Sequence, residues 1–263
     1  MMVFNKRLAL VIGNILIPII CFIILAILSI GQGDYTEIFE PAGNESLIDP
    51  INFTFAIWGP IFLLLFIFVL YQLRDFFKGK LNEPETKYID QVSIYFMLST
   101  IMTSFWYAFW LYRIIWLATI FMGLYFISLL IGYLRLEINL AERTRIEKIA
   151  ITIPWSMYTA WVTAATIVSL TTFLVSIGFN NPPFILSDTY WAVVVLVVAL
   201  IVYTATLLMR NDYVFGIVGI WVLLGIMFER LFAPVAILEI IITAIIGIIV
   251  LSVAILYQAL RTR

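Results

Sequence analysis

The chain has 263 residues, of which 64% are hydrophobic and only 12% are charged, whereas about 25% of the residues in ordinary soluble domains are charged. A soluble fold of this length could not bury so much apolar surface, so the composition predicts a protein embedded in a lipid bilayer. The formal net charge of -1 excludes a general basic surface for nucleic acid. Because the chain contains no histidine and a single cysteine, Cys21, we expect neither metal-ligating nor catalytic residues of the usual kinds.

Eight stretches are long and apolar enough to cross a bilayer, which requires about 20 residues in a helix. They are residues 7–31, 53–73, 91–111, 114–136, 148–177, 189–209, 213–229 and 234–258. At the start of the first stretch, Lys6 and Arg7 precede an apolar run from Leu8 to Ile30, which is longer than the apolar region of a signal peptide, so we interpret it as a membrane helix. The sequence therefore predicts an all-α, multi-pass integral membrane protein with about eight transmembrane helices.

The distribution of basic residues predicts the orientation of these helices, because lysine and arginine are enriched in cytoplasmic loops. With eight spans and the N-terminus in the cytoplasm, only Arg113 and Arg230 of the 15 basic residues lie on the outer side. Seven or nine spans would mix the basic residues between the two sides. We therefore expect both termini in the cytoplasm.

The first outer loop, residues 32–52, is acidic and contains no basic residue. Its acidic residues are Asp34, Glu37, Glu40, Glu45 and Asp49. Two N-x-S/T triplets begin at Asn44 and Asn52, and either would be glycosylated only in a suitable host. Two interpretations stay open for this loop: a solvated acidic connector, or a lid over a pocket.

Ionisable residues inside membrane spans are costly and therefore informative. Glu239, near the start of the last span, is the exception to their general absence here. Its side chain either reaches the outer surface or pairs with Arg230 or Arg113. One shallow glutamate gives little support to an ion pump.

Aromatic residues are frequent in the spans, and several recur at helical spacing. Trp106 and Trp110 are four positions apart in the third stretch, and Trp155, Tyr158 and Trp161 follow a three-residue spacing in the fifth. Such rings suit either a flat-walled cavity for a planar hydrophobic ligand or direct packing between helices. The candidate ligand-binding residues are Trp58, Trp106, Trp110, Trp155, Tyr158 and Trp161.

Three of these stretches resemble the signature of a known family. Residues 55–62, with the sequence FAIWGPIF, resemble its second-helix motif, F-G-P-V-W-x-x-L-Y, although Pro60 here follows Trp58. The positions of the third-helix motif, L-N-x-x-W-x-x-x-F, are occupied by Met102, Thr103, Trp106 and Trp110, so the tryptophan is kept and the asparagine is lost. The fifth-helix motif, P-Y-x-x-W-x-x-x-A/T-x-x-N, resembles Pro154, Tyr158, Trp161 and Ala165, with an insertion between Pro154 and Tyr158 and with Val168-Ser169 where Leu-Asn is expected. The chain resembles the TspO/MBR family of tryptophan-rich sensory proteins and peripheral-type benzodiazepine receptors, and is similar to a longer prokaryotic branch with additional helices.

The resemblance implies a TspO/MBR-like five-helix bundle over residues 1–178, followed by three additional transmembrane helices over residues 189–260. It also implies a pocket that opens toward the loop before the second helix, lined or flanked by Trp58, Trp106, Tyr158 and Trp161. Ligands of the family are porphyrins, sterol-like molecules and synthetic benzodiazepine-type compounds. A prokaryotic plasma membrane is the location that the resemblance implies.

Two functions are consistent with these observations. The first is a membrane receptor or sensor that binds a planar hydrophobic ligand, a porphyrin (tetrapyrrole) or a sterol-like molecule; the alternative is a transporter of a hydrophobic or amphipathic small molecule. Enzymatic activity is not expected, although tryptophan-assisted degradation of porphyrin stays open. The expected partners are the lipid bilayer and the hydrophobic ligand, with a homodimer left open. No cofactor is required, and a bound porphyrin or lipid stays an open alternative.

Overall fold

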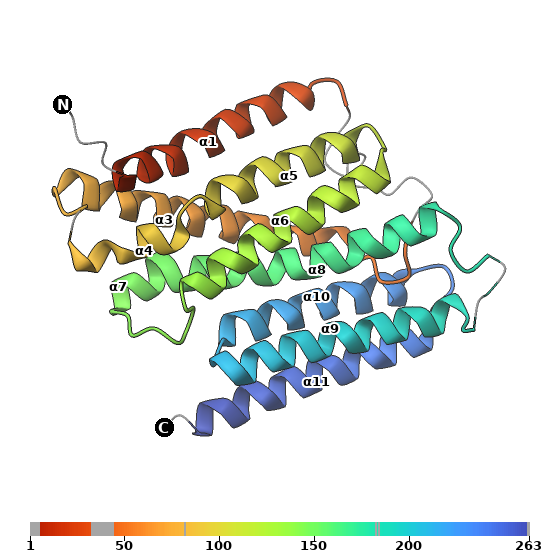
Figure 1. Cartoon of the computed structure of the whole chain (residues 1–263). Helices are drawn as coiled ribbons and strands as arrows, with labels where there is room; N and C mark the ends of the chain where they lie inside the picture. The colour runs from red at the N-terminus through yellow and green to blue at the C-terminus, as the bar shows by residue number, and fades with distance from the viewer. Residues whose placement is uncertain (1–5, 33–44, 82, 182, 184, 262–263) are drawn as a thin grey trace. The chain divides into compact units, whose positions relative to one another are not determined.

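The structure is a computed structural model that describes residues 6–32, 45–81, 83–181, 183 and 185–261. Regular structure within these residues is helical, without a β-strand (Figure 1). The long helices are α1 (Lys6–Leu28), α3 (Trp58–Phe77), α5 (Tyr95–Leu111), α6 (Ile115–Arg135), α8 (Ile153–Ser176), α9 (Asp188–Arg210), α10 (Tyr213–Phe232) and α11 (Leu238–Arg261). The short helices are η1 (Asn52–Ile57), η2 (Pro84–Thr86), α4 (Lys87–Val92), α7 (Arg145–Glu147) and the π-helix η3 (Lys148–Thr152). The acidic residues Asp34, Glu37 and Glu40 and the triplet at Asn44 lie outside the described residues.

Seven helical stretches of the described chain are long and apolar enough to cross a membrane. They correspond to seven of the predicted spans, with ends that differ from the predicted ones by a few residues. The remaining predicted span, 91–111, contains the 17-residue helix α5, which is about 26 Å long and therefore at the lower limit for crossing the hydrocarbon core. The prediction of an all-α multi-pass membrane protein is confirmed, whereas the cytoplasmic position of both termini stays a prediction.

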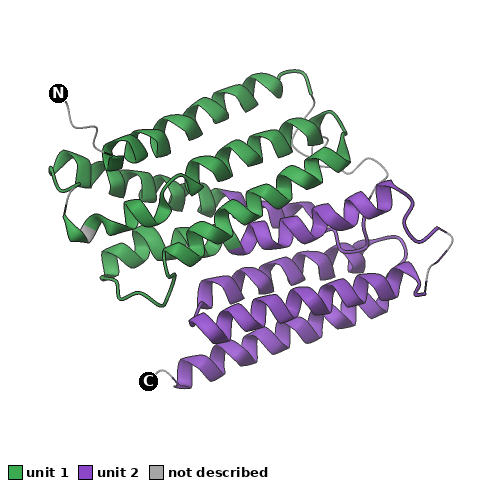
Figure 2. Cartoon of the chain, viewed as in Figure 1, with its two compact units in different colours: residues 1–33, 59–159 green, residues 34–58, 160–263 purple. Residues whose placement is uncertain are grey.

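The chain forms two compact units, shown in different colours in Figure 2. The first unit consists of residues 1–33 and 59–159, and the second of residues 34–58 and 160–263. Within the described residues the chain passes from one unit to the other at the start of α3 and again within α8. The sequence predicted another division, into a five-helix bundle over residues 1–178 and three further helices over residues 189–260. The two compact units do not test this division, and it stays a prediction.

The core of the first unit is built around Trp155, whose side chain is fully buried. Its ring packs against Phe68 of α3 at a centroid distance of 5.9 Å and against Phe96 of α5 at 6.2 Å. Helix α6 approaches the same ring closely because residue 132 is glycine: a Cβ atom there would lie 2.5 Å from Trp155 Cη2. Three helices therefore converge on one aromatic side chain near the beginning of α8.

The beginning of α8 is also where the helical hydrogen-bond pattern changes. Residues Lys148–Thr152 form the π-helix η3 directly before Pro154. Proline has no backbone N–H to donate to the carbonyl four residues earlier, and its ring clashes with that carbonyl in a regular α-helix. The wider π turn accommodates Pro154, so the irregularity at this position follows from the sequence.

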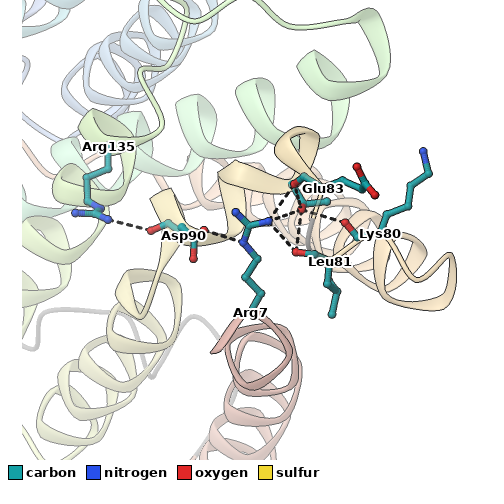
Figure 3. Close-up of polar contacts among 7 residues, drawn as sticks. Arg7, Lys80, Leu81, Glu83, Asp90 and Arg135 are labelled. Carbon is teal, nitrogen blue, oxygen red and sulfur yellow. Dashed lines mark hydrogen bonds and ion pairs between the residues drawn. The ribbon is translucent and has the colours of Figure 1, made fainter. Parts of the chain in front are cut away.

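One end of the first unit is held together by arginine side chains (Figure 3). Arg7 of α1 donates through Nε to Asp90 Oδ2 at 2.7 Å and through Nη1 to the carbonyl oxygen of Leu81 at 2.7 Å and to Thr86 Oγ1 at 2.9 Å. Arg135, at the end of α6, donates to the backbone carbonyl of Asp90 at 2.9 Å. The N-terminal end of α1, the loop after α3 and the C-terminal end of α6 therefore meet at this end of the first unit.

The second unit packs α9, α10 and α11 together with most of α8. Tyr203 of α9 is buried, donates its hydroxyl to the carbonyl of Ala160 at 2.7 Å and packs on Phe215 of α10 at 5.1 Å. At one end of the unit, the side chain of Gln258 on α11 donates to Asn211, which follows α9. These polar contacts between apolar helices fix their pairing, as expected where lipid supplies no hydrophobic driving force for helix association.

Candidate ligand-binding site

The second unit contains a cluster of three aromatic rings, Phe55, Trp58 and Trp161, which we call the Trp161 cluster. Trp161 lies on α8, and its ring meets Phe55 edge to face at a centroid distance of 5.7 Å and Trp58 at 6.1 Å. The side chain of Trp161 is only 3% exposed, and its indole Nε1 has no hydrogen-bond partner among the described residues. The cluster therefore combines two aromatic rings that each stand nearly perpendicular to the Trp161 ring with one buried donor.

Helix α10 positions the segment that supplies Phe55 and Trp58. The indole Nε1 of Trp221 donates to the carbonyl oxygen of Thr54 at 2.8 Å, and the amide of Ile51 donates to the carbonyl oxygen of Gly225 at 3.1 Å. Phe53 adds an edge-to-face contact with Trp221 at 5.5 Å. These contacts hold the 3-10 helix η1 against α10, and Phe55 and Trp58 on the same short stretch meet Trp161.

A second set of contacts holds the preceding segment, residues 46–51. The carboxylate of Asp49 accepts hydrogen bonds from the backbone N–H and the hydroxyl of Ser46, both at 2.9 Å. The Ser46 hydroxyl in turn accepts from Thr171 Oγ1 of α8 at 3.1 Å. Burial raises the pKa of Asp49 to about 6 against the lowering effect of the Ser46 hydrogen bonds and of the positive charge of Arg230, and Glu45 raises it further. Ser46 therefore links the segment to α8 through Thr171, and the carboxyl whose pKa is raised holds Ser46 in place from within the segment.

The raised pKa of Asp49 predicts a pH dependence of this segment. Below about pH 4 the Asp49 carboxyl is protonated both in the docked and in the undocked segment. Because its pKa is about 6 in the docked segment and 3.8 in the free carboxyl, ionisation between these values favours the undocked form, and the folded protein loses stability as pH rises. We expect the melting temperature of the wild-type chain, relative to that of Asp49→Asn, to fall between about pH 4 and pH 7. All other titrating groups are the same in the two proteins. A difference between their melting temperatures that stays constant over this pH range would therefore contradict the prediction.

The structure brings some of the six predicted site residues together and separates others. Trp58 and Trp161 share the Trp161 cluster, and Trp106 and Trp110 contact each other on α5 at 6.2 Å. Tyr158 instead contacts Tyr125 of α6, at 5.7 Å, and Trp155 occupies the packed core of the first unit. Ligand contact by Trp106, Trp110, Trp155 and Tyr158 stays a prediction.

Sequence reasoning missed a buried polar pair in the first unit. Asn14 of α1 and Gln72 of α3 are both fully buried, and the Asn14 amide donates to Gln72 Oε1 at 3.0 Å. Asp75, one turn beyond Gln72, is also buried and accepts from Tyr88 Oη at 3.0 Å. A scan restricted to ionisable residues in the centres of the spans overlooks uncharged amides and a carboxylate near a helix end. Scoring every polar residue in the apolar stretches would have found Asn14 and Gln72.

The single intramembrane carboxylate that the sequence suggested had two alternatives, to reach the surface or to pair with an arginine. Glu239, in the first turn of α11, is exposed. The guanidinium of Arg230 pairs with its neighbour Glu229 at 3.3 Å. Among the described residues, no group of three or more histidine, cysteine, aspartate or glutamate side chains is placed to hold a metal ion.

Comparison with known proteins gives one match. The family model described as TSPO-like protein matches residues 8–257, which is nearly the whole chain and includes α9, α10 and most of α11. No curated protein and no solved structure matches the chain.

Proposed function

The chain belongs to the family of TSPO-like proteins, and from this premise we propose a function. We propose that the protein is a membrane receptor or sensor, and that its ligand is a planar hydrophobic molecule, either a porphyrin or a sterol-like molecule. Family membership supports a sensor- or receptor-type role in general, and the seven membrane-spanning helical stretches make the protein a multi-pass membrane protein. We further propose that the ligand binds at the Trp161 cluster and that the host membrane is a prokaryotic plasma membrane.

The proposal for the site rests on the geometry around Trp161. Aromatic rings in perpendicular arrangements present both ring faces and ring edges, which are the surfaces that a flat conjugated ligand contacts best. The buried indole N–H of Trp161 can only donate, and a buried donor without an acceptor costs about 1–3 kcal/mol. A ligand with a nitrogen or oxygen acceptor at its edge would remove this cost on binding. The site therefore favours a planar ligand that is apolar on its faces and carries an acceptor on its rim.

Two substitutions of Trp161 separate the contribution of the ring from that of the N–H. Trp161→Phe keeps an aromatic surface but removes the donor, and we expect it to weaken porphyrin binding by about tenfold, the equivalent of one hydrogen bond. Trp161→Ala removes both and should weaken binding further. Binding is followed by the shift in porphyrin absorbance, a signal that does not depend on the tryptophans being replaced.

The control for this experiment is Trp116→Phe, because Trp116 on α6 is exposed and has no place in the proposed site. Its affinity for porphyrin should equal that of the wild type. Unchanged affinity in Trp161→Ala, with the fold retained, would remove the Trp161 cluster as the binding site.

Transport of a hydrophobic or amphipathic small molecule is a second candidate, favoured by the π-helix η3, because π turns within longer helices are frequent at functional sites. Residues Arg145–Ser176 nevertheless form one continuous helical stretch, whereas transporter binding sites are typically built from discontinuous helices. Porphyrin flux into proteoliposomes that is faster than into protein-free liposomes would favour transport. Binding without flux would leave the receptor as the better description.

We also propose that the bound ligand is not chemically converted. The test is the absorbance of an illuminated porphyrin, with and without the protein. Equal decay in the two samples is expected. Faster decay in the presence of the protein, lost in Trp161→Phe, would instead assign a degradative activity to this site.

A further inference from the structure

The second unit contains a small apolar cavity between α8, α9 and α10. Ala164 and Val168 of α8, Leu196 of α9 and Val222 and Leu223 of α10 are among its walls. The cavity volume is about 20 Å³, which is room for one or two waters. Tyr203 supplies the single polar side chain among the lining residues, and its hydroxyl already donates to the carbonyl of Ala160. A cavity lined in this way offers water too few partners and is expected to be dry.

One wall of this cavity does not come from a helix. Ile48 lies in segment 46–51, between the undescribed part of the first loop and η1, yet its side chain is only 2% exposed and lines the cavity. All the other lining residues belong to α8, α9 or α10. Three membrane helices therefore form an apolar socket, and a loop side chain completes it.

Polar contacts at its two ends link the segment that bears Ile48 to the helices of the second unit. Ser46 accepts from Thr171 of α8, and the amide of Ile51 donates to the carbonyl of Gly225 on α10. Between these points Ile48 makes apolar contact with the cavity walls, and Pro50 lies close to Gly225 of α10. Displacement of the segment would therefore open the socket without breaking any helix.

We propose that this socket is a binding site for a small branched or cyclic aliphatic group, and that Ile48 occupies its entrance in the present structure. A ligand that displaces segment 46–51 would replace the apolar contacts of Ile48 with those of its own aliphatic group. The site is separate from the Trp161 cluster, so the inference does not depend on the function proposed above.

The test uses photolabelling of the full chain in lipid nanodiscs by a small aliphatic diazirine, with the labelled residues located by mass spectrometry. Ile48→Ala removes three side-chain carbons from the entrance and should raise labelling of Leu196 and Leu223 severalfold. Adding Ala164→Leu to Ile48→Ala fills the socket and should abolish that labelling. Ala199→Leu fills it from α9 instead, in case the first filling substitution prevents folding.

The lipid-exposed control is Ile249 of α11, which is 55% exposed and should be labelled equally in every variant. Labelling of Leu196 and Leu223 that follows the size of the socket supports the site. Labelling of these residues that is the same in Ile48→Ala and in the filled variants would overturn it, because the label would then reach them only from the lipid.

Discussion

Replacement of Trp155 by alanine is expected to lower the free energy of unfolding by about 3–5 kcal/mol, the range for deleting a fully buried large aromatic side chain. The indole is completely buried and packs on Phe68 and Phe96 from two other helices. Its removal therefore leaves a cavity bordered by α3, α5 and α6, which the surrounding helices can close only in part. Thermal unfolding of the ligand-free protein, followed by circular dichroism in detergent, measures this loss.

Helix α6 offers a matched pair of glycines for the converse experiment on the same contact. Gly132→Ala inserts a methyl group against the Trp155 ring and should destabilise the fold by about 1–3 kcal/mol, as overpacking does. Gly123→Ala, on the same helix, meets no heavy atom within 4 Å and should be neutral or slightly stabilising, since alanine favours helix. Equal melting temperatures for the two glycine variants would contradict the close packing of α6 on Trp155.

Substitution of Gly225 by alanine is expected to displace η1 from α10 and to weaken porphyrin binding at the same time. A Cβ atom at this position would overlap Thr54 Oγ1 and lie 2.8 Å from Thr54 Cγ2 and 3.0 Å from Pro50 Cβ. The segment must move to relieve the overlap, at a cost of about 1–3 kcal/mol. Phe55 and Trp58 would then lose their positions against Trp161. The measurements are the melting temperature and the porphyrin affinity of the ligand-binding assay.

The double variant Thr54→Ala with Gly225→Ala distinguishes this steric explanation from a general loss of stability. Thr54 Oγ1 has no hydrogen-bond partner among the described residues, so its removal costs little by itself, whereas it frees the space that the new methyl group needs. Stability and affinity should both recover in the double variant. Failure of the rescue would show that the close approach of Thr54 and Gly225 does not position η1.

Hydropathy alone predicted the membrane helices, because the bilayer imposes both the length and the composition of a span. The partners of individual aromatic residues could not be predicted in the same way. Trp155, Tyr158 and Trp161 follow a three-residue spacing, but six residues at 100° each place Trp155 and Trp161 about 120° apart around α8. Trp155 accordingly packs on Phe68 and Phe96, and Trp161 on Phe55 and Trp58.

The polar contacts show why tertiary pairing is harder to predict than span position. Asn14 and Gln72 are 58 positions apart and bond to each other inside the first unit. The sequence around Asn14 or around Gln72 does not indicate that these two residues of α1 and α3 meet in the folded protein. The docking of η1 on α10, through Thr54 and Trp221, joins residues 167 positions apart and was equally inaccessible from local patterns.

The most direct test of the Trp161 cluster is an NMR titration with porphyrin of protein labelled with nitrogen-15 at the indole of its 8 tryptophans. Each indole N–H gives one signal, and Trp161→Phe identifies the signal of interest by its loss. The structure predicts that the Trp161 signal shifts as its buried N–H gains an acceptor, whereas that of the exposed Trp116 does not move. A bound porphyrin that leaves the Trp161 signal in place would contradict the proposed site.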